Sequence, residues 1–148
     1  MTDLSRPSPF ASQIGGDHYA RWGCQPFEFA LRNGLNPAQT KIIKYVMRHD
    51  TKGGAEDIRK AIHVCDLWIT LTADLPNLLP TMTPAELALL EIPYLSFDDF
   101  CRRNPSLGER ERDIVALACA ASDLDRIRRV RDALAGLLAS AYPAWSAL

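Results

Sequence analysis

The segment NPAQTKIIKYVMRHDTKGGAEDIRKAIHVCDLWIT, residues 36–70, decides the fold class. Asn36-Pro37 is a helix-start signal, because an asparagine side chain caps the first free amides and proline fits the first helical turn. On both sides of the glycine loop at residues 50–54, apolar residues recur three and four positions apart, as on a helix face buried in a core. The segment therefore predicts two helices joined by a short loop.

The rest of the chain carries the same helical signals and no sustained strand-like alternation. Pro26 favours a helix that Asn33-Gly34 ends, and capping residues precede further helical stretches near residues 84, 97 and 123. Residues 109–121 form one more helical stretch. Three prolines, at residues 76, 80 and 84, interrupt the pattern. We predict an all-α fold, a small helical domain followed by a C-terminal helical extension. The expected segments are a flexible arm at 1–16, the domain at 17–73, a linker at 74–83 and the C-terminal helical region at 84–148.

Size and composition are those of a soluble globular protein. The chain has 148 residues, of which 47% are apolar and 24% charged. Its net charge of −1 does not favour nucleic acid as a partner. No apolar run approaches the roughly 20 residues that span a bilayer, so we expect a cytoplasmic protein with no membrane contact. The four cysteines lack CxxC spacing and are interpreted as reduced thiols.

Polar chemistry is concentrated between residues 17 and 63. Lys41, Lys44 and Arg48 lie three and four residues apart, which places them on one helix face. The next predicted helix presents Glu56, Lys60 and His63 together, directly after the glycine loop. Helix-start amides and glycine backbone bind anions readily, so this arrangement suggests a phosphate site with a metal beside it.

Simpler interpretations of the same residues stay open. The basic face is also typical of a solvated helix, and Glu56-Asp57 complements a helix dipole. His63 is compatible with a core position, and Asp57 with Lys60 makes a surface ion pair worth about 0–1 kcal/mol. No P-loop, dinucleotide-binding glycine motif, nucleophile elbow or HExxH zinc motif is present.

Several pieces of this sequence resemble the phage nucleotide kinase-like family in residues and in order. They are GGDHY (15–19), QPFEF (25–29), NGL (33–35), IKYVMRH (43–49), KGG (52–54) and EDIRKAIH (56–63). The family includes the small P-loop-less nucleotide kinase of short-tailed coliphages, which phosphorylates deoxynucleoside monophosphates with a nucleoside triphosphate. The resemblance covers roughly residues 15–72 and implies a phage nucleotide-binding protein, first of all a kinase of this kind.

The resemblance also implies roles for individual residues. Catalytic roles fall on five residues, of which the cations neutralise phosphate oxygens and the histidines orient or deprotonate: His18, Lys44, Arg48, Lys60 and His63. Substrate contacts fall on six, with the tyrosines stacking on the base: Tyr19, Lys41, Tyr45, Lys52, Gly53 and Gly54. Glu56 or Asp57 is expected to hold Mg²⁺, with ATP or another nucleoside triphosphate as donor.

Two alternatives remain beside the kinase. All-α nucleotide pyrophosphatases hold Mg²⁺ with about four carboxylates on facing helices, and the helix around residues 43–48 offers none. A non-catalytic protein that binds nucleotides or a host partner would use the same basic face without turnover. We expect a homo-oligomer, because the apolar stripe of the last helix, with Leu134, Leu137 and Leu138, needs a partner surface.

Overall fold

Two layers of helices build the molecule. The computed structural model describes residues 8–11, 22–75 and 82–145, and this part of the chain contains seven α-helices and no strand. The helices are α1 (Pro26–Asn33), α2 (Pro37–Arg48), α3 (Ala55–Asp74), α4 (Pro84–Leu89), α5 (Phe97–Arg103), α6 (Glu109–Ala120) and α7 (Leu124–Ala141). Short 3₁₀ turns occur at η1 (Pro9–Ala11) and η3 (Pro143–Trp145). The prediction of an all-α fold is confirmed.

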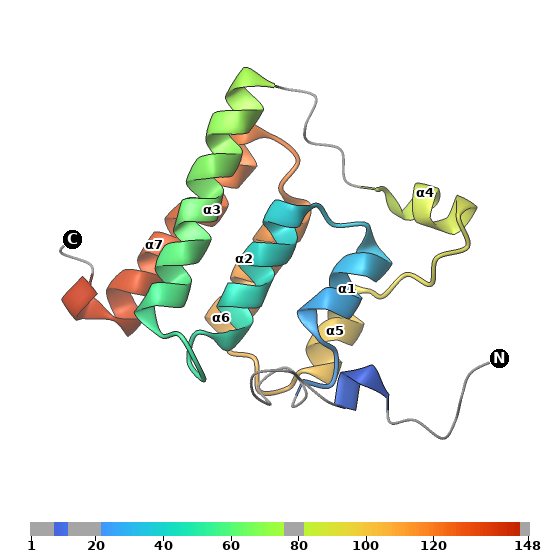
Figure 1. Cartoon of the computed structure of the whole chain (residues 1–148), viewed down its shortest axis with the longest axis horizontal. Helices are drawn as coiled ribbons and strands as arrows, with labels where there is room; N and C mark the ends of the chain where they lie inside the picture. Colours follow the sequence, from blue (N-terminus) through green and yellow to red (C-terminus); the bar gives the residue numbers. More distant parts are fainter. Residues whose placement is uncertain (1–7, 12–21, 76–81, 146–148) are drawn as a thin grey trace.

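The long helices pack as two pairs. Helices α2 and α3 form one layer, and α6 and α7 lie behind them, so that α3 packs on α7 and α2 packs on α6 (Figure 1). Helix α1 lies beside α2, whereas α4 and α5 sit at the margin of the molecule (Figure 1). One layer of the fold is thus the pair of helices that carries most of the predicted site.

Helix ends follow the capping signals of the sequence. The Asn36 side chain accepts a hydrogen bond from the Gln39 amide, and the Gln39 side chain accepts one from the Asn36 amide, both at 2.9 Å. Gly34 ends α1 with a φ of 61°, a left-handed conformation that glycine adopts without steric cost. Asp123 caps α7 by accepting from the Arg126 amide at 2.8 Å. These contacts fix the start of α2, the end of α1 and the start of α7.

A single hydrophobic core runs through both halves of the chain. Helices α2 and α3 contribute side chains such as Ile42, Val46 and Ile58, while α6 and α7 contribute others such as Val115 and Ile127, all of them fully buried. The predicted domain at 17–73 and the predicted C-terminal region at 84–148 therefore share one core. Most of the predicted arm and linker, at residues 1–7, 12–16 and 76–81, lies outside the described residues.

The apolar stripe of α7 is covered within the chain. Leu134 and Leu137 are buried in the core, and Leu138 packs against its edge. The stripe predicted to need a second copy of the chain therefore packs on α3 and α6 instead. Because this stripe is covered within the chain, it gives no reason to expect a homo-oligomer.

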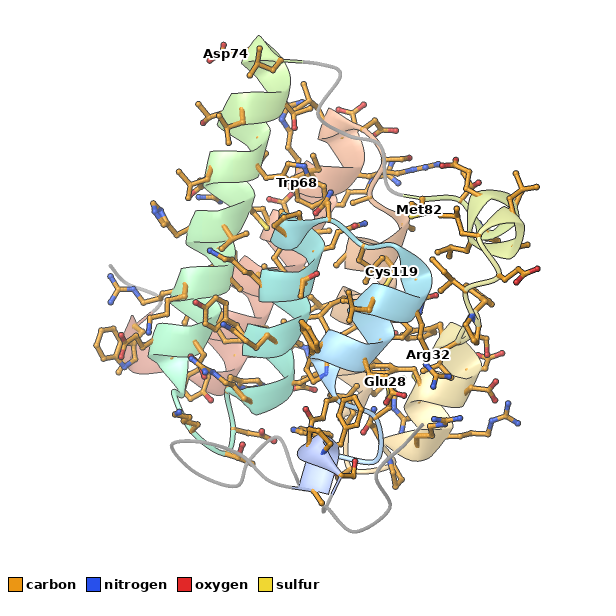
Figure 2. The ribbon with its side chains drawn as sticks, turned by 45° about the vertical axis from the view of Figure 1, so that its right-hand side comes forward. Glu28, Arg32, Trp68, Asp74, Met82 and Cys119 are labelled. Atoms are coloured by element: carbon orange, nitrogen blue, oxygen red, sulfur yellow. The ribbon has the colours of Figure 1, made fainter. Side chains whose placement is uncertain are left out.

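Smaller contacts attach the margin to the core. The rings of Phe29 in α1 and Phe100 in α5 stack with centroids 4.1 Å apart. Asn104, at the end of α5, donates to the carbonyl of Cys24 at 3.0 Å and accepts from its amide at 3.2 Å. Met82, which Figure 2 places between α4 and α1, donates its amide hydrogen to the Gly34 carbonyl oxygen at 3.2 Å.

The cysteines and the helix lengths also bear on the sequence predictions. All four thiols, of Cys24, Cys65, Cys101 and Cys119, are free of disulfides. Burial raises the pKa of the Cys24 thiol to about 11 and that of Cys65 to about 12. Among the described helices, none combines the length and apolar character needed to cross a membrane.

Candidate functional site

Five predicted site residues line one open groove between α2 and α3, which we call the α2/α3 groove. It has a volume of about 550 Å³. The lining residues are Lys41 and Tyr45 from α2, and Glu56, Arg59, Lys60, His63, Val64 and Leu67 from α3. Helical spacing brings them together, since residues 56, 59, 60 and 63 share one side of α3. His63 is exposed here and is not a core residue.

The α2/α3 groove continues into a mainly apolar hollow of about 350 Å³ near the start of α2. Lys41, Val64 and Leu67 line both parts. Trp68 of α3 lies near the first turn of α2 (Figure 2), and Trp68 and Pro37 both line the hollow. One end of the groove is thus basic and the other apolar, which suits a ligand with a charged part and a flat or aliphatic part.

The basic end carries more positive than negative charge. Lys41, Arg59 and Lys60 are cationic, and Glu56 is the one carboxylate among the lining residues. Glu56 pairs with Lys60 at 3.1 Å, and the two side chains are 71% and 46% exposed. An ion pair so open to water contributes little, about 0–1 kcal/mol, so an incoming anion can displace Glu56 from Lys60.

Tyr45 separates the groove from a second group of cations. The Lys44 Nζ lies 4.7 Å from the centre of the Tyr45 ring, and the Arg48 Cζ lies 5.1 Å from it. Lys44 itself lines a different cavity of about 140 Å³ against α1. Partial burial lowers its pKa, and repulsion from Arg48 and Lys41 adds to the effect. The three cations of the predicted face therefore lie in different surroundings. Lys41 lines the groove, Lys44 lines the cavity against α1, and Arg48 lies against the Tyr45 ring.

Arg48 and Asp57 form a buried ion pair beneath the glycine loop. The Arg48 Nε donates to Asp57 Oδ2 at 3.0 Å, and its Nη2 donates to Oδ1 at 2.9 Å. The Gly53 amide donates to the same Oδ2 at 3.1 Å, and Asp57 is 1% exposed. A Cβ on Gly53 would lie 2.2 Å from the Asp57 carboxyl carbon, so this approach needs glycine.

This geometry corrects two expectations for the loop. The anion that Gly53 holds is the Asp57 carboxylate, and the Gly54 amide donates to the His49 carbonyl at 2.6 Å, so neither amide is open to a phosphate. The Lys52 amide likewise donates to the Arg48 carbonyl at 2.9 Å, while the Lys52 side chain lies exposed. The loop thus joins α2 to α3 with these three amides bonded within the chain.

The predicted magnesium ligands do not converge. Asp57 uses both oxygens for Arg48 and Gly53, whereas Glu56 points outward to Lys60. Across the described residues no three His, Cys, Asp or Glu side chains come together in the manner of a metal site. Magnesium prefers oxygen ligands arranged as an octahedron, and these two carboxylates do not fit such a site.

A partly buried polar cluster joins the end of α2 to α6 and to the end of α7, and no sequence pattern predicted it. His49 Nε2 lies 2.8 Å from Glu111 Oε1, and its Nδ1 lies 2.7 Å from the Tyr142 hydroxyl. Tyr142 also donates to the His49 carbonyl at 3.3 Å. Burial raises the pKa of Tyr142, as do nearby carboxylates. The partners lie 62 and 93 positions from His49, beyond the reach of a spacing argument.

Two predicted site residues, His18 and Tyr19, lie outside the described residues. Conversely, Arg59 lines the groove although it was not predicted, and the signal for it was its place between Glu56 and His63 on one helix side. No family model, curated protein or solved structure matches the chain in comparisons with known proteins.

Proposed function

We propose that this chain is a phage protein that binds a deoxynucleotide in the α2/α3 groove, and that it acts as a deoxynucleoside monophosphate kinase without a P-loop. The observation that carries the proposal is the convergence of three cations and an aromatic ring on a groove that continues into an apolar hollow. The resemblance of residues 15–72 to the phage nucleotide kinase-like family supports the choice of ligand and reaction.

The basic end of the groove is suited to the phosphates. Lys41, Arg59 and Lys60 would neutralise phosphate oxygens, and charge neutralisation with positioning is most of what phosphoryl transfer asks of a protein. The ring of Tyr45 and the apolar hollow near Trp68 would take up the base and sugar. Because the carboxylates do not fit Mg²⁺, no step of the reaction is assigned to a protein-held metal.

Binding without turnover is the second candidate, and one observation favours it. Asp57, the buried carboxylate next to the groove, is fully engaged by Arg48 and Gly53. A nucleotide in the groove would meet Glu56 as its acidic neighbour among the lining residues. The same scarcity of carboxylates counts against a pyrophosphatase, which needs about four.

Substitutions in the groove test the binding part of the proposal. Lys41→Ala and Lys60→Ala should each weaken binding of deoxynucleoside monophosphates about tenfold, because each removes a charge-assisted hydrogen bond to phosphate. Titration calorimetry measures the affinities. Arg128→Ala is the matched control, since Arg128 is an exposed cation on α7 that pairs with Asp125. Equal affinities in all three variants would place the phosphate elsewhere.

A product assay distinguishes the two candidate functions. The protein is incubated with each deoxynucleoside monophosphate, ATP and Mg²⁺, and the nucleotides are separated by chromatography. Formation of deoxynucleoside diphosphate with equimolar ADP supports the kinase. Tight binding with no product supports the non-catalytic protein, and release of pyrophosphate from the triphosphate would contradict both.

A further inference from the structure

A second hollow adjoins the α2/α3 groove across helix α3. This α3/α7 hollow has a volume of about 190 Å³ and is lined by Arg59, Ile62, His63, Asp66, Leu138 and Trp145. Trp145 belongs to η3, which lies beside the N-terminal half of α3 (Figure 1). Arg59 and His63 line both the groove and this hollow. The two spaces therefore share a border made of one cation and one imidazole.

The α3/α7 hollow has the features of a site for a flat aromatic group. Trp145 is 43% exposed, and its ring lies under the Arg59 guanidinium, whose Cζ is 5.2 Å from the ring centre. Ile62 and Leu138 supply apolar walls. Tryptophan rings and arginine planes are the side chains on which nucleic acid bases stack without selecting among them.

The charges around this hollow do not oppose an anionic ligand. Asp66 is the single carboxylate in the lining, and it accepts hydrogen bonds from Arg131 of α7. Its charge is therefore matched inside the chain. Arg59 and His63, on the border with the groove, are the positions to which phosphates attached to a stacked base would extend.

We propose that the α3/α7 hollow binds the base of the nucleoside triphosphate donor, with the Trp145 ring as its stacking partner. This inference rests on the proposed function, because it gives the second nucleotide of the reaction a place. The acceptor monophosphate would occupy the α2/α3 groove, and the two sets of phosphates would meet at Arg59 and His63.

The transfer that this arrangement serves balances without a further reactant. An oxygen of the monophosphate attacks the γ-phosphorus of the donor, and a new P–O bond forms there. The bond from that phosphorus to the β,γ-bridging oxygen breaks, and its electron pair leaves with the diphosphate. The products are one deoxynucleoside diphosphate and one nucleoside diphosphate, and Arg59 lies where it neutralises the charge on the transferred group.

Replacement of the tryptophan ring tests the donor site. Trp145→Leu should weaken binding of a non-hydrolysable ATP analogue fivefold or more, the effect of losing one base–aromatic stack. Its affinity for deoxynucleoside monophosphates should stay within twofold of the original chain. Trp145→Phe, which keeps a stacking ring, should restore most of the affinity for the analogue. Tyr94→Leu is the control, because Tyr94 is an exposed aromatic residue outside both cavities.

The outcomes separate this inference from the function on which it rests. If the original chain and Trp145→Leu bind the ATP analogue equally while monophosphates still bind, the donor site is wrong and the nucleotide-binding function stands. The inference is also overturned if monophosphates bind and the analogue does not. If neither nucleotide binds to the original chain, both proposals fall together.

Discussion

Among single residues, Arg48 and Asp57 make an ion pair that links the end of α2 to the start of α3. Both carboxylate oxygens accept from the guanidinium, and the side chains are 14% and 1% exposed. Removing one partner of such a pair costs more than the pair itself contributes, because the other side chain stays in the interior after the ion pair is lost. The pair thus holds the ends of α2 and α3 together across the loop.

We predict that Asp57→Asn lowers the free energy of unfolding by about 3 kcal/mol, because a neutral amide weakens the hydrogen bonds that this buried side chain accepts from Arg48 and Gly53. Urea titration followed by circular dichroism measures the change. Glu56→Gln is the matched control, since the neighbouring carboxylate belongs to an exposed pair worth about 0–1 kcal/mol. If both variants lost the same free energy of unfolding, the buried Arg48–Asp57 pair would contribute no more to stability than the exposed Glu56–Lys60 pair.

Asp57 was predicted as a magnesium ligand, but in the structure its carboxylate accepts from Arg48 and Gly53. The sequence showed a carboxylate at a helix start next to two glycines, a pattern equally compatible with a metal ligand and with an internal anion. Which of these applies depends on the path of the loop, because it brings Arg48, nine positions away, against Asp57. Spacing on one helix does not contain that information.

At the scale of helices, ends were predictable because capping is local. Asn36 and Gln39, or Thr83 and Glu86, satisfy each other's backbone within four residues, so the signal is present in the sequence itself. The groove was partly predictable for the same reason, since Lys60 and His63 lie on one side of a helix. The contact of Trp145 with Arg59 was not predictable, because it depends on the packing of α7 on α3.

The two capping boxes give a prediction at this scale. Asn36→Ala should cost about 1 kcal/mol of global stability, the usual value of a helix cap, because α2 belongs to the core. Thr83→Ala should change global stability much less, since α4 has six residues and buries only Leu87. Thermal and urea unfolding of both variants measure the difference. An equal loss would mean that α4 unfolds together with the core.

At the scale of the whole molecule, buried thiols make stability depend on alkaline pH. Burial raises the pKa of Cys65 and of Cys119 from 9.0 to about 12, and that of Cys24 to about 11. The fold thus favours the protonated thiols, and this stabilisation is complete below pH 9. It is lost as the pH rises from about 9 to 12. The raised pKa of Tyr142 acts in the same sense, whereas the lowered pKa of Lys44 opposes it.

We therefore predict that the urea concentration at the midpoint of unfolding decreases as the pH is raised from 8 to 10.5. The reason is that unfolding at high pH releases the protons of the buried thiols. Cys65→Ala is the informative control. This variant should be less stable than the original chain at pH 8, because the core loses part of a buried side chain. Its stability should, however, decrease less than that of the original chain when the pH is raised from 8 to 10.5. A decline as steep as that of the original chain would show that the Cys65 thiol does not carry the effect.

The core shared by both halves also has a meaning for synthesis on the ribosome. The facing surfaces of α2 and α3, with Ile42, Val46 and Ile58, are covered by α6 and α7 only after those helices have been made. Helix α7 ends 67 residues after α3, a delay of roughly 3–13 s at about 5–20 residues per second. During that interval the α2–α3 hairpin of the nascent chain exposes apolar surface. We expect chaperones that act at the ribosome to bind this surface.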